Sequence, residues 1–118
     1  MKKADNPELI RVTRMLKSKA TELDAPIWKS VAKHLEKSKH RHRVVNISRI
    51  NRYTKDNETV TVPGKVLGSG TLDHKVSVAA FQFSEEAQKK IEATGGQCLT
   101  FSALMKQNRK GKNLKIIG

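Results

Sequence analysis

Apolar residues recur at helical spacing in the first third of the chain. One stripe consists of Leu9, Val12, Leu16 and Leu23, and a second consists of Trp28, Val31, Ala32 and Leu35. This spacing places the members of each stripe on one face of a helix. A proline that suits the first turn of a helix precedes each stripe, Pro7 after the capping residue Asn6 and Pro26 after Asp24. The pattern predicts two helices in residues 1–36, packed as a hairpin or a corner.

Beyond residue 43 the apolar positions form short strings instead. The strings lie at residues 44–47, 60–62, 76–78 and 98–101 and are rich in valine and other strand-forming residues. Each string is followed by a turn or a short helix, at irregular separations. The pattern favours an α/β fold in which N-terminal helices precede a layered core of short strand-strand-helix units in residues 44–105.

The most organised unit spans residues 65–96. The glycines that open it, Gly64, Gly68 and Gly70, predict a tight loop. Val76, Val78 and Ala80 then alternate as in a strand. The alternation changes phase after Ala80, so we expect the strand to bulge or end there. Because Leu67 and Leu72 bracket Gly68 and Gly70, we expect these two glycines to serve the loop's backbone geometry rather than contact with a partner.

Helix signals close this unit and the next one. Ser84 can accept a hydrogen bond from a free helix N–H, and the two glutamates after it suit the positive end of the helix dipole. Gly95 is well placed as the left-handed stop of this helix. A second short helix is expected at residues 101–107, directly after Thr100.

This unit resembles the shared signature of two related ribosomal protein families, the bacterial "L-fifteen" type and the archaeal and eukaryotic "L-eighteen-e" type. The matching residues are Lys65-Val66-Leu67-Gly68, Gly70, Leu72, Lys75, the valine strand, Phe83-Ser84, Ala87, Ile91-Glu92 and Gly95-Gly96. The run Asn46-Ile47-Ser48-Arg49-Ile50 and the N-terminal helices are most similar to the archaeal "L-eighteen-e" form.

The resemblance covers nearly the whole chain and carries several expectations. It implies a core arranged as an irregular superhelix and a structural role in the archaeal large ribosomal subunit, in the cytoplasm. The implied partners are large-subunit rRNA and neighbouring ribosomal proteins. The resemblance implies no catalytic residue, no cofactor and no small-molecule substrate.

Charge supports a polyanionic partner. The 118 residues include 24 Lys and Arg against 11 Asp and Glu, a formal charge of +13. The excess is local, because residues 29–55 hold nine basic side chains and one acid, Glu36. We therefore expect one domain over residues 1–118, divided into helices (1–36), a basic segment (37–43), the strand and helix core (44–105) and a mobile basic tail (106–118).

The candidates for RNA contact come from these basic regions. They are Lys37, Lys39, His40, Arg41, His42, Arg43, Arg49, Arg52, Tyr53, Lys55, Lys65, Lys75, Arg109, Lys110 and Lys112. Guanidinium groups make forked contacts to phosphate and stack on bases, which favours the arginines at 41, 43, 49 and 52. The tyrosine is equally consistent with stacking on a base and with an ordinary core or surface position.

Other functions find less support. The single cysteine, Cys98, permits no internal disulfide and is expected to be a buried, inert thiol. Four histidines with one cysteine make a poor metal set, and no cofactor or metal is predicted. The run Asp73-His74 near Ser69 lacks the evidence of a catalytic triad, and no apolar run is long enough to span a membrane. A helix-turn-helix or DNA-compacting protein is the main alternative, because the same charge would serve it, and an RNA-modifying enzyme is a third.

Overall fold

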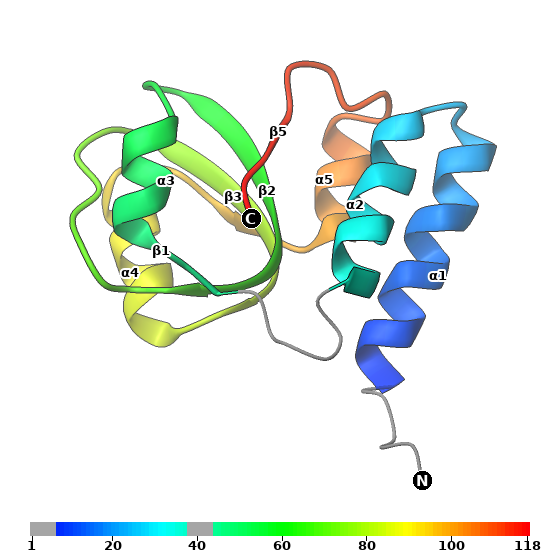
Figure 1. Ribbon diagram of the computed structural model, residues 1–118. Coiled ribbons are helices and arrows are strands. Elements are labelled where there is room, and N and C mark those ends of the chain that lie inside the picture. Colours follow the sequence, from blue (N-terminus) through cyan, green and yellow to red (C-terminus); the bar gives the residue numbers. More distant parts are fainter. Residues whose placement is uncertain (1–6, 38–43) are drawn as a thin grey trace, which may run out of the picture.

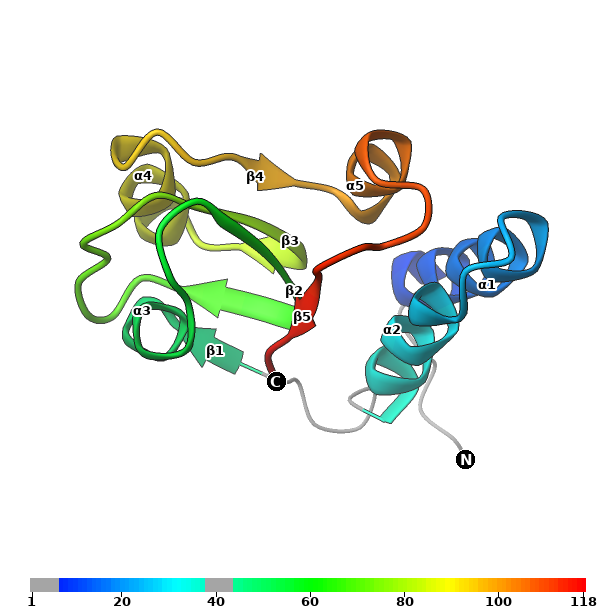
Figure 2. The same ribbon diagram turned by 90° about the horizontal axis from the view of Figure 1, so that it is seen from above.

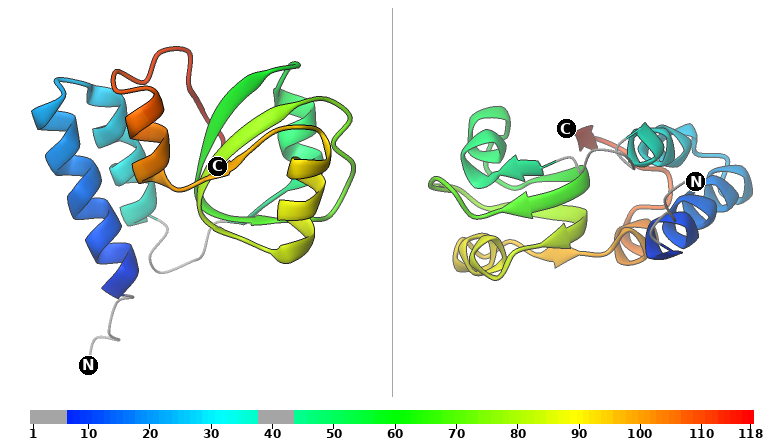
Figure 3. Two further views of the ribbon diagram at one scale, coloured as in Figure 1. Left: turned by 180° about the vertical axis from the view of Figure 1, so that it is seen from behind. Right: turned by 60° about the horizontal axis from the view of Figure 1, so that its bottom comes forward.

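The computed structural model describes residues 7–37 and 44–118, which form strands flanked by two groups of helices (Figure 1). The elements are α1 (Pro7–Glu22), α2 (Pro26–Lys37), β1 (Val44–Asn46), α3 (Ile47–Tyr53), β2 (Glu58–Leu67), β3 (Val76–Phe83), α4 (Glu85–Ala93), β4 (Cys98–Leu99), α5 (Phe101–Gln107) and β5 (Lys115–Ile116). Helices α3 and α4 lie on one side of the strands, and α1, α2 and α5 lie on the other (Figures 1 and 3). The predicted α/β class with N-terminal helices is confirmed.

The strands form a parallel sheet centred on β2. The order is β1-β2-β3-β4, and β5 also pairs with β2. Because β3 accompanies β2 from Glu58 to Val66, β1 and β5 share the opposite edge of β2. There β1 pairs with residues 65–67 and β5 pairs with residues 60 and 61. Figure 2 shows β5 beside β2, where the chain returns from α5.

Strand β3 separates two cores by the alternation of its side chains. Val76, Val78 and Ala80 pack with α3 and α4. Ala79 and Phe81 face the opposite way and pack with α1, α2 and α5. Successive side chains of a strand point to opposite faces, so β3 supplies both cores at once.

Helices α1 and α2 pack against each other as the predicted hairpin. The four apolar residues predicted for α2 are all buried, whereas in α1 the buried residues are Leu9, Thr13, Leu16 and Ala20. Val12 is only half-buried, and Leu23 lies beyond the end of the helix. The Thr13 hydroxyl avoids the cost of burial because it hydrogen-bonds the carbonyls of Leu9 and Ile10, at 3.0 and 2.9 Å.

The glycine loop begins later than the sequence predicts. Strand β2 runs through Pro63 and Gly64 to Leu67, and its register with β3 shifts between Val62 and Lys65. Proline cannot donate to a ladder and glycine tolerates a bulge, so the sheet absorbs both residues as an irregularity. The sequence predicted that the strand would bulge or end near Ala80. Ala80 pairs with Val62, where the bulge in β2 begins, and β3 itself does not end there but continues to Phe83.

The predicted cap at Ser84 is confirmed, and Thr100 caps the predicted short helix α5 in the same way, whereas Asp24, with φ +52°, does not cap α2 and Asn6 lies outside the described residues. The Ser84 side chain accepts from the Ala87 N–H at 3.1 Å, and the Thr100 side chain accepts from the Ala103 N–H at 3.0 Å. Gly95 has φ +90° directly after α4, as a left-handed stop requires. The string at residues 44–47 is divided, because β1 ends at Asn46 and Ile47 begins α3.

The C-terminal segment is folded, so the expectation of a mobile tail is wrong. Lys106 belongs to α5, and Lys115 and Ile116 form β5. Ile117 is 6% exposed, and its N–H donates to the Thr61 carbonyl at 2.9 Å. The indole N–H of the fully buried Trp28 donates to the Arg109 carbonyl at 2.8 Å. These contacts bind the segment to both the helical hairpin and the sheet.

Candidate RNA-binding surface

Helix α3 presents three of the candidate side chains to solvent. Ile47 and Ile50 are fully buried and fix the inner face of this seven-residue helix. Arg49, Arg52 and Tyr53 are exposed on its outside. Tyr53 is 48% exposed to solvent, which excludes the possibility that it is a core residue.

Arg49 and Tyr53 form a cation–π pair on this face. The guanidinium carbon of Arg49 lies 5.1 Å from the centroid of the Tyr53 ring. A cation at this distance from an aromatic face is attracted by the ring's quadrupole. The pair offers a flat surface for a base beside a positive charge for a phosphate.

The glycine loop holds α3 in place through its backbone. The Ser48 N–H donates to the Ser69 carbonyl at 3.0 Å, and the Asn51 side-chain oxygen accepts from the Asp73 N–H at 3.1 Å. Lys90 of α4 donates from the other side to the carbonyls of Gly68 and Gly70, at 2.6 and 2.7 Å. The loop therefore links α3 to α4.

Gly70 has a structural role in this link. Its φ is +102°, and a Cβ added there would lie 2.5 Å from the Ser48 Cβ and 2.8 Å from the Ser48 nitrogen. Any side chain would therefore be strained and would also collide with the start of α3. This geometry supports the expectation that the glycine serves the fold.

The residues Asp73 and His74 form a clamp rather than a catalytic triad. One ring nitrogen of His74 lies 2.8 Å from an Asp73 oxygen, and the other lies 2.7 Å from the Thr54 hydroxyl. The hydrogen bonds from His74 and Asn51 lower the pKa of the Asp73 carboxyl. The Thr54 hydroxyl is buried and donates to the Ile50 carbonyl at 2.7 Å, so it is not presented to a substrate. The Ser69 side chain makes none of the hydrogen bonds of this clamp.

Lys55 and Lys75 lie close to the C-terminal end of α3. Both are exposed, and the Asp56 side chain, which follows Lys55, accepts from the Lys75 N–H at 3.0 Å. Glu58 accepts from the Lys55 N–H at 2.7 Å, which is the main reason that its pKa is lowered, and the Lys115 ammonium lies 3.2 Å away. Lys115 also donates to the Tyr53 carbonyl at 3.1 Å, so β5 supports the end of α3.

Two further candidates border the basic segment. Lys37 is exposed at the end of α2, and the half-buried Lys65 of β2 pairs with Val44 at the start of β1. The candidates Lys39, His40, Arg41, His42 and Arg43 lie outside the described residues. Their role in RNA binding stays a prediction.

The last three candidates form a separate group after α5. Arg109, Lys110 and Lys112 are exposed. The ammonium of Lys110 donates to the Leu23 carbonyl at 2.7 Å, beyond the end of α1, so this lysine is partly committed to the fold. Gly111 packs against Ile27 at the start of α2, which places this turn about one helix length, roughly 15 Å, from Lys37. The described candidates therefore fall into two groups. One surrounds α3, and the other lies on the turn after α5, at a distance from Lys37.

The structure also shows a row of three cations on α2, of which only Lys37 was among the candidate residues. Lys29, Lys33 and Lys37 recur every four residues on α2, and all three are exposed. None has an ion pair in residues 7–37 and 44–118. The spacing itself is the signal that could have identified the row from the sequence.

Cys98 is half-buried in β4, not buried as expected. Partial burial, assisted by the charge of Glu92, raises the pKa of its thiol to about 11. The neutral thiol is a weak nucleophile, so the expectation that it is inert agrees with this pKa.

Other binding chemistry finds no site in the described ranges. Within residues 7–37 and 44–118, no three His, Cys, Asp or Glu side chains are grouped as metal ligands would be. None of the helices in the same ranges has the length and apolarity needed to cross a membrane.

Comparison with known proteins identifies the family. Residues 2–118 match the family described as "Ribosomal protein 60S L18 and 50S L18e". The chain belongs to this family. The proteins named "Large ribosomal subunit protein eL18" from Methanothermobacter thermautotrophicus and Methanoregula boonei are 51% and 46% identical over 112 residues, covering 95% of this chain and 93% of each relative. The Archaeoglobus fulgidus protein of the same name is 44% identical over 112 residues, covering 95% of this chain and 96% of its own length.

Family membership confirms the resemblance found for the "L-eighteen-e" type. It does not favour a DNA-binding protein, and it gives no support to an RNA-modifying enzyme, since these relatives are named as ribosomal subunit proteins.

Proposed function

We propose that the chain is a structural constituent of the large ribosomal subunit and scaffolds its rRNA. Its relatives are named as large-subunit proteins, and they match the chain over nearly its whole length. The role requires no catalytic group. The place of action is the ribosome in the cytoplasm.

The observation that carries the RNA-binding role is the surface of α3. Arg49 and Arg52 are exposed, and neither has an acidic partner in the described parts of the chain. The acids nearest in sequence are already engaged, because Asp56 accepts from Lys75 and Glu58 pairs with Lys115. An arginine that is not neutralised by the protein is available to neutralise phosphate.

The fold contributes by holding these charges in a fixed array. The loop hydrogen bonds to Ser48, Asn51 and Thr54 fix α3 along its length before any RNA is bound. A preordered surface loses less conformational entropy on binding than a flexible one. The basic segment at residues 37–43 directly precedes β1 in the sequence, and its predicted RNA contacts would add to those of α3.

The proposal is tested by the salt dependence of binding to a transcript of large-subunit rRNA. In Arg49→Ala/Arg52→Ala the slope of log K against log salt should fall by about two units, roughly one for each phosphate that the variant no longer neutralises. The double variant Arg14→Ala/Lys89→Ala removes the same charge from exposed positions on α1 and α4 and serves as the matched control.

A slope that falls equally in both variants would show that net charge, and not the α3 surface, governs binding. Circular dichroism melts of both variants verify that the fold is retained, because all four side chains are exposed.

A further inference from the structure

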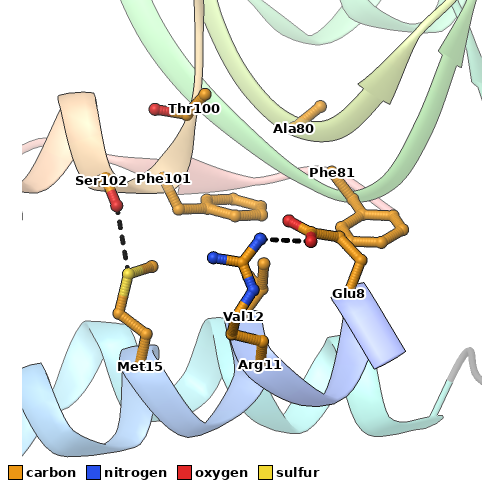
Figure 4. Close-up of a pocket in the computed structure, with 9 residues that line it drawn as sticks. All are labelled: Glu8, Arg11, Val12, Met15, Ala80, Phe81, Thr100, Phe101 and Ser102. Carbon is orange, nitrogen blue, oxygen red and sulfur yellow. Dashed lines mark hydrogen bonds and ion pairs between the residues drawn. The ribbon is translucent and has the colours of Figure 1, made fainter. Parts of the chain in front are cut away.

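A groove runs between α1 and α5 (Figure 4), and these helices lie on the side of the sheet opposite α3 (Figure 1). It consists of two adjoining cavities of about 280 and about 240 Å³. Met15 of α1 and Ser102 of α5 line both cavities, and the Ser102 hydroxyl donates to the Met15 sulfur at 3.1 Å between them. We refer to these two cavities together as the α1–α5 groove.

Apolar side chains line both cavities, and the walls of the first also contain many polar groups. In the first cavity, Val12 and Met15 face Phe81 and Phe101, as Figure 4 shows. In the second cavity, Leu23 and Met105 continue the apolar lining. Val12, Met15, Leu23 and Phe81 are only half-buried, so apolar surface in the groove remains in contact with water.

Charge is distributed unevenly along the groove. At the first cavity Arg11 pairs with Glu8, so that end is close to neutral. At the second cavity the charged residues that line the groove are Lys19, Lys106 and Arg109. Lys19 pairs with Glu22, whereas the side chains of Lys106 and Arg109 have no ion pair in residues 7–37 and 44–118. The groove therefore has a neutral end with mixed polar and apolar walls, and a mostly apolar end with a basic rim.

We propose that the α1–α5 groove binds an extended segment of a neighbouring protein, with apolar side chains at one end and acidic side chains at the other. The apolar end would occupy the first cavity, beside Val12 and Phe81. The acidic end would meet Lys106 and Arg109 at the second. The inference rests on the proposed function only in that a subunit protein has protein neighbours.

A peptide fits this surface better than RNA does. Phosphate gains nothing from an apolar wall, and Phe101 is 3% exposed, so its ring offers no free face on which a base could stack. Apolar anchors in a pocket with charges at the rim are typical of protein interfaces.

The length of the groove defines a probe. From Glu8 to its end at Glu22, helix α1 spans about 21 Å, which an extended peptide covers with about seven residues. The probe is a heptapeptide with blocked ends, with phenylalanine and leucine in one half and four glutamates in the other. A peptide of reversed sequence tests the opposite direction, and an analogue with alanine for both apolar residues tests the anchor.

The full chain is titrated with each peptide, and amide chemical shifts are recorded by NMR. We expect saturable shifts confined to α1, α5 and the end of β3, with a Kd below about 1 mM for the better direction. The alanine analogue should bind at least about tenfold more weakly, because it lacks the apolar anchors.

Two variants locate the binding in the groove. Ser102→Trp, at an exposed position in the middle of the groove, should fill it and weaken binding about tenfold. Lys106→Glu should weaken binding about fivefold through repulsion of the glutamates. Lys89→Glu makes the same charge change on α4 and should leave peptide affinity unchanged.

Absence of saturable binding by either peptide would overturn the proposal. So would equal losses in Lys106→Glu and Lys89→Glu, which would indicate attraction by net charge. If Ser102→Trp instead reduced binding of the rRNA transcript and left peptide binding intact, the groove would belong to RNA. These results are independent of the α3 variants, so failure of this proposal and failure of the proposed function can be distinguished.

Discussion

Two basic regions of this protein use their cations differently. Around α3 the polypeptide backbone is fixed by neutral hydrogen bonds from the glycine loop, and Arg49 and Arg52 remain free of acidic partners in the described structure. After α5 two of the cations take part in the fold, since Lys110 binds carbonyls beyond α1 and Lys115 binds Tyr53 and Glu58. A dense basic sequence is therefore not by itself a binding surface, because some of its charges stabilise the protein.

The largest effect should come from breaking the support of α3. Gly70→Val should destabilise the free protein by about 3 kcal/mol, because it adds a branched side chain at φ +102° and against Ser48. Thermal and denaturant melts of the isolated protein measure the change.

Substitution of a second glycine, Gly95, separates the effect of backbone strain from the effect of a steric clash with Ser48. Gly95 has a similar φ of +90°, but a Cβ there would meet only Lys75, at 3.9 Å. Gly95→Ala should therefore cost about 1 kcal/mol, less than Gly70→Ala. A wild-type melting midpoint for Gly70→Val would exclude the structural role of this glycine.

The next effect concerns the basic segment that leads into β1. Arg41→Ala/Arg43→Ala should weaken rRNA binding about tenfold or more at physiological salt and lower the salt slope by about two units, with the fold intact. Filter binding over a series of salt concentrations measures both quantities. An unchanged salt slope would indicate that the RNA contacts lie elsewhere, on the turn after α5.

The connection between the hairpin and the C-terminal segment should respond more weakly. Trp28→Phe removes the donor to the Arg109 carbonyl and should cost about 1 kcal/mol, or somewhat more because the side chain is smaller. Hydrogen exchange should show faster opening of β5 in this variant, while the amides of α3 keep their protection. Equal acceleration in both regions would show that they open as one unit.

The smallest effect distinguishes two neighbouring lysines. Lys110→Met should lower stability by about 0.5 kcal/mol, because the carbonyls of Leu23 and Asp24 lose a charged donor. Lys112→Met should leave stability unchanged, because its ammonium has no hydrogen bond or ion pair in the described residues. If Lys112 contacts RNA, only its variant should lower the salt slope without lowering stability.

Local patterns predicted the local structure well. The apolar stripe of α2, the cap at Ser84 and the short helix after Thr100 depend on neighbours within one or two helical turns, which the sequence displays directly. Thr13 was missed in α1 because its burial depends on a hydrogen bond to its own helix, which a pattern of apolar residues does not detect.

Features that depend on distant partners were predicted poorly. Gly64 suggested the start of a loop, yet β2 continues through it because the residues on either side, Val62 and Lys65, pair with β3. The basic C-terminal segment suggested mobility, yet Lys115 and Ile116 find the free edge of β2, more than 50 residues earlier in the chain. For the site, composition identified the basic regions, but not which charges the fold itself uses.

The bond between Trp28 and Arg109 spans 81 residues, and the bond between Lys110 and Leu23 spans 87. Contacts of such separation form only after long loops have closed, and their entropic cost must be met before they stabilise the chain. The hairpin at one end of the sequence therefore completes its core only when α5 and β5 arrive from the other. Folding should be cooperative over the whole chain and slower than for a helical bundle of equal length.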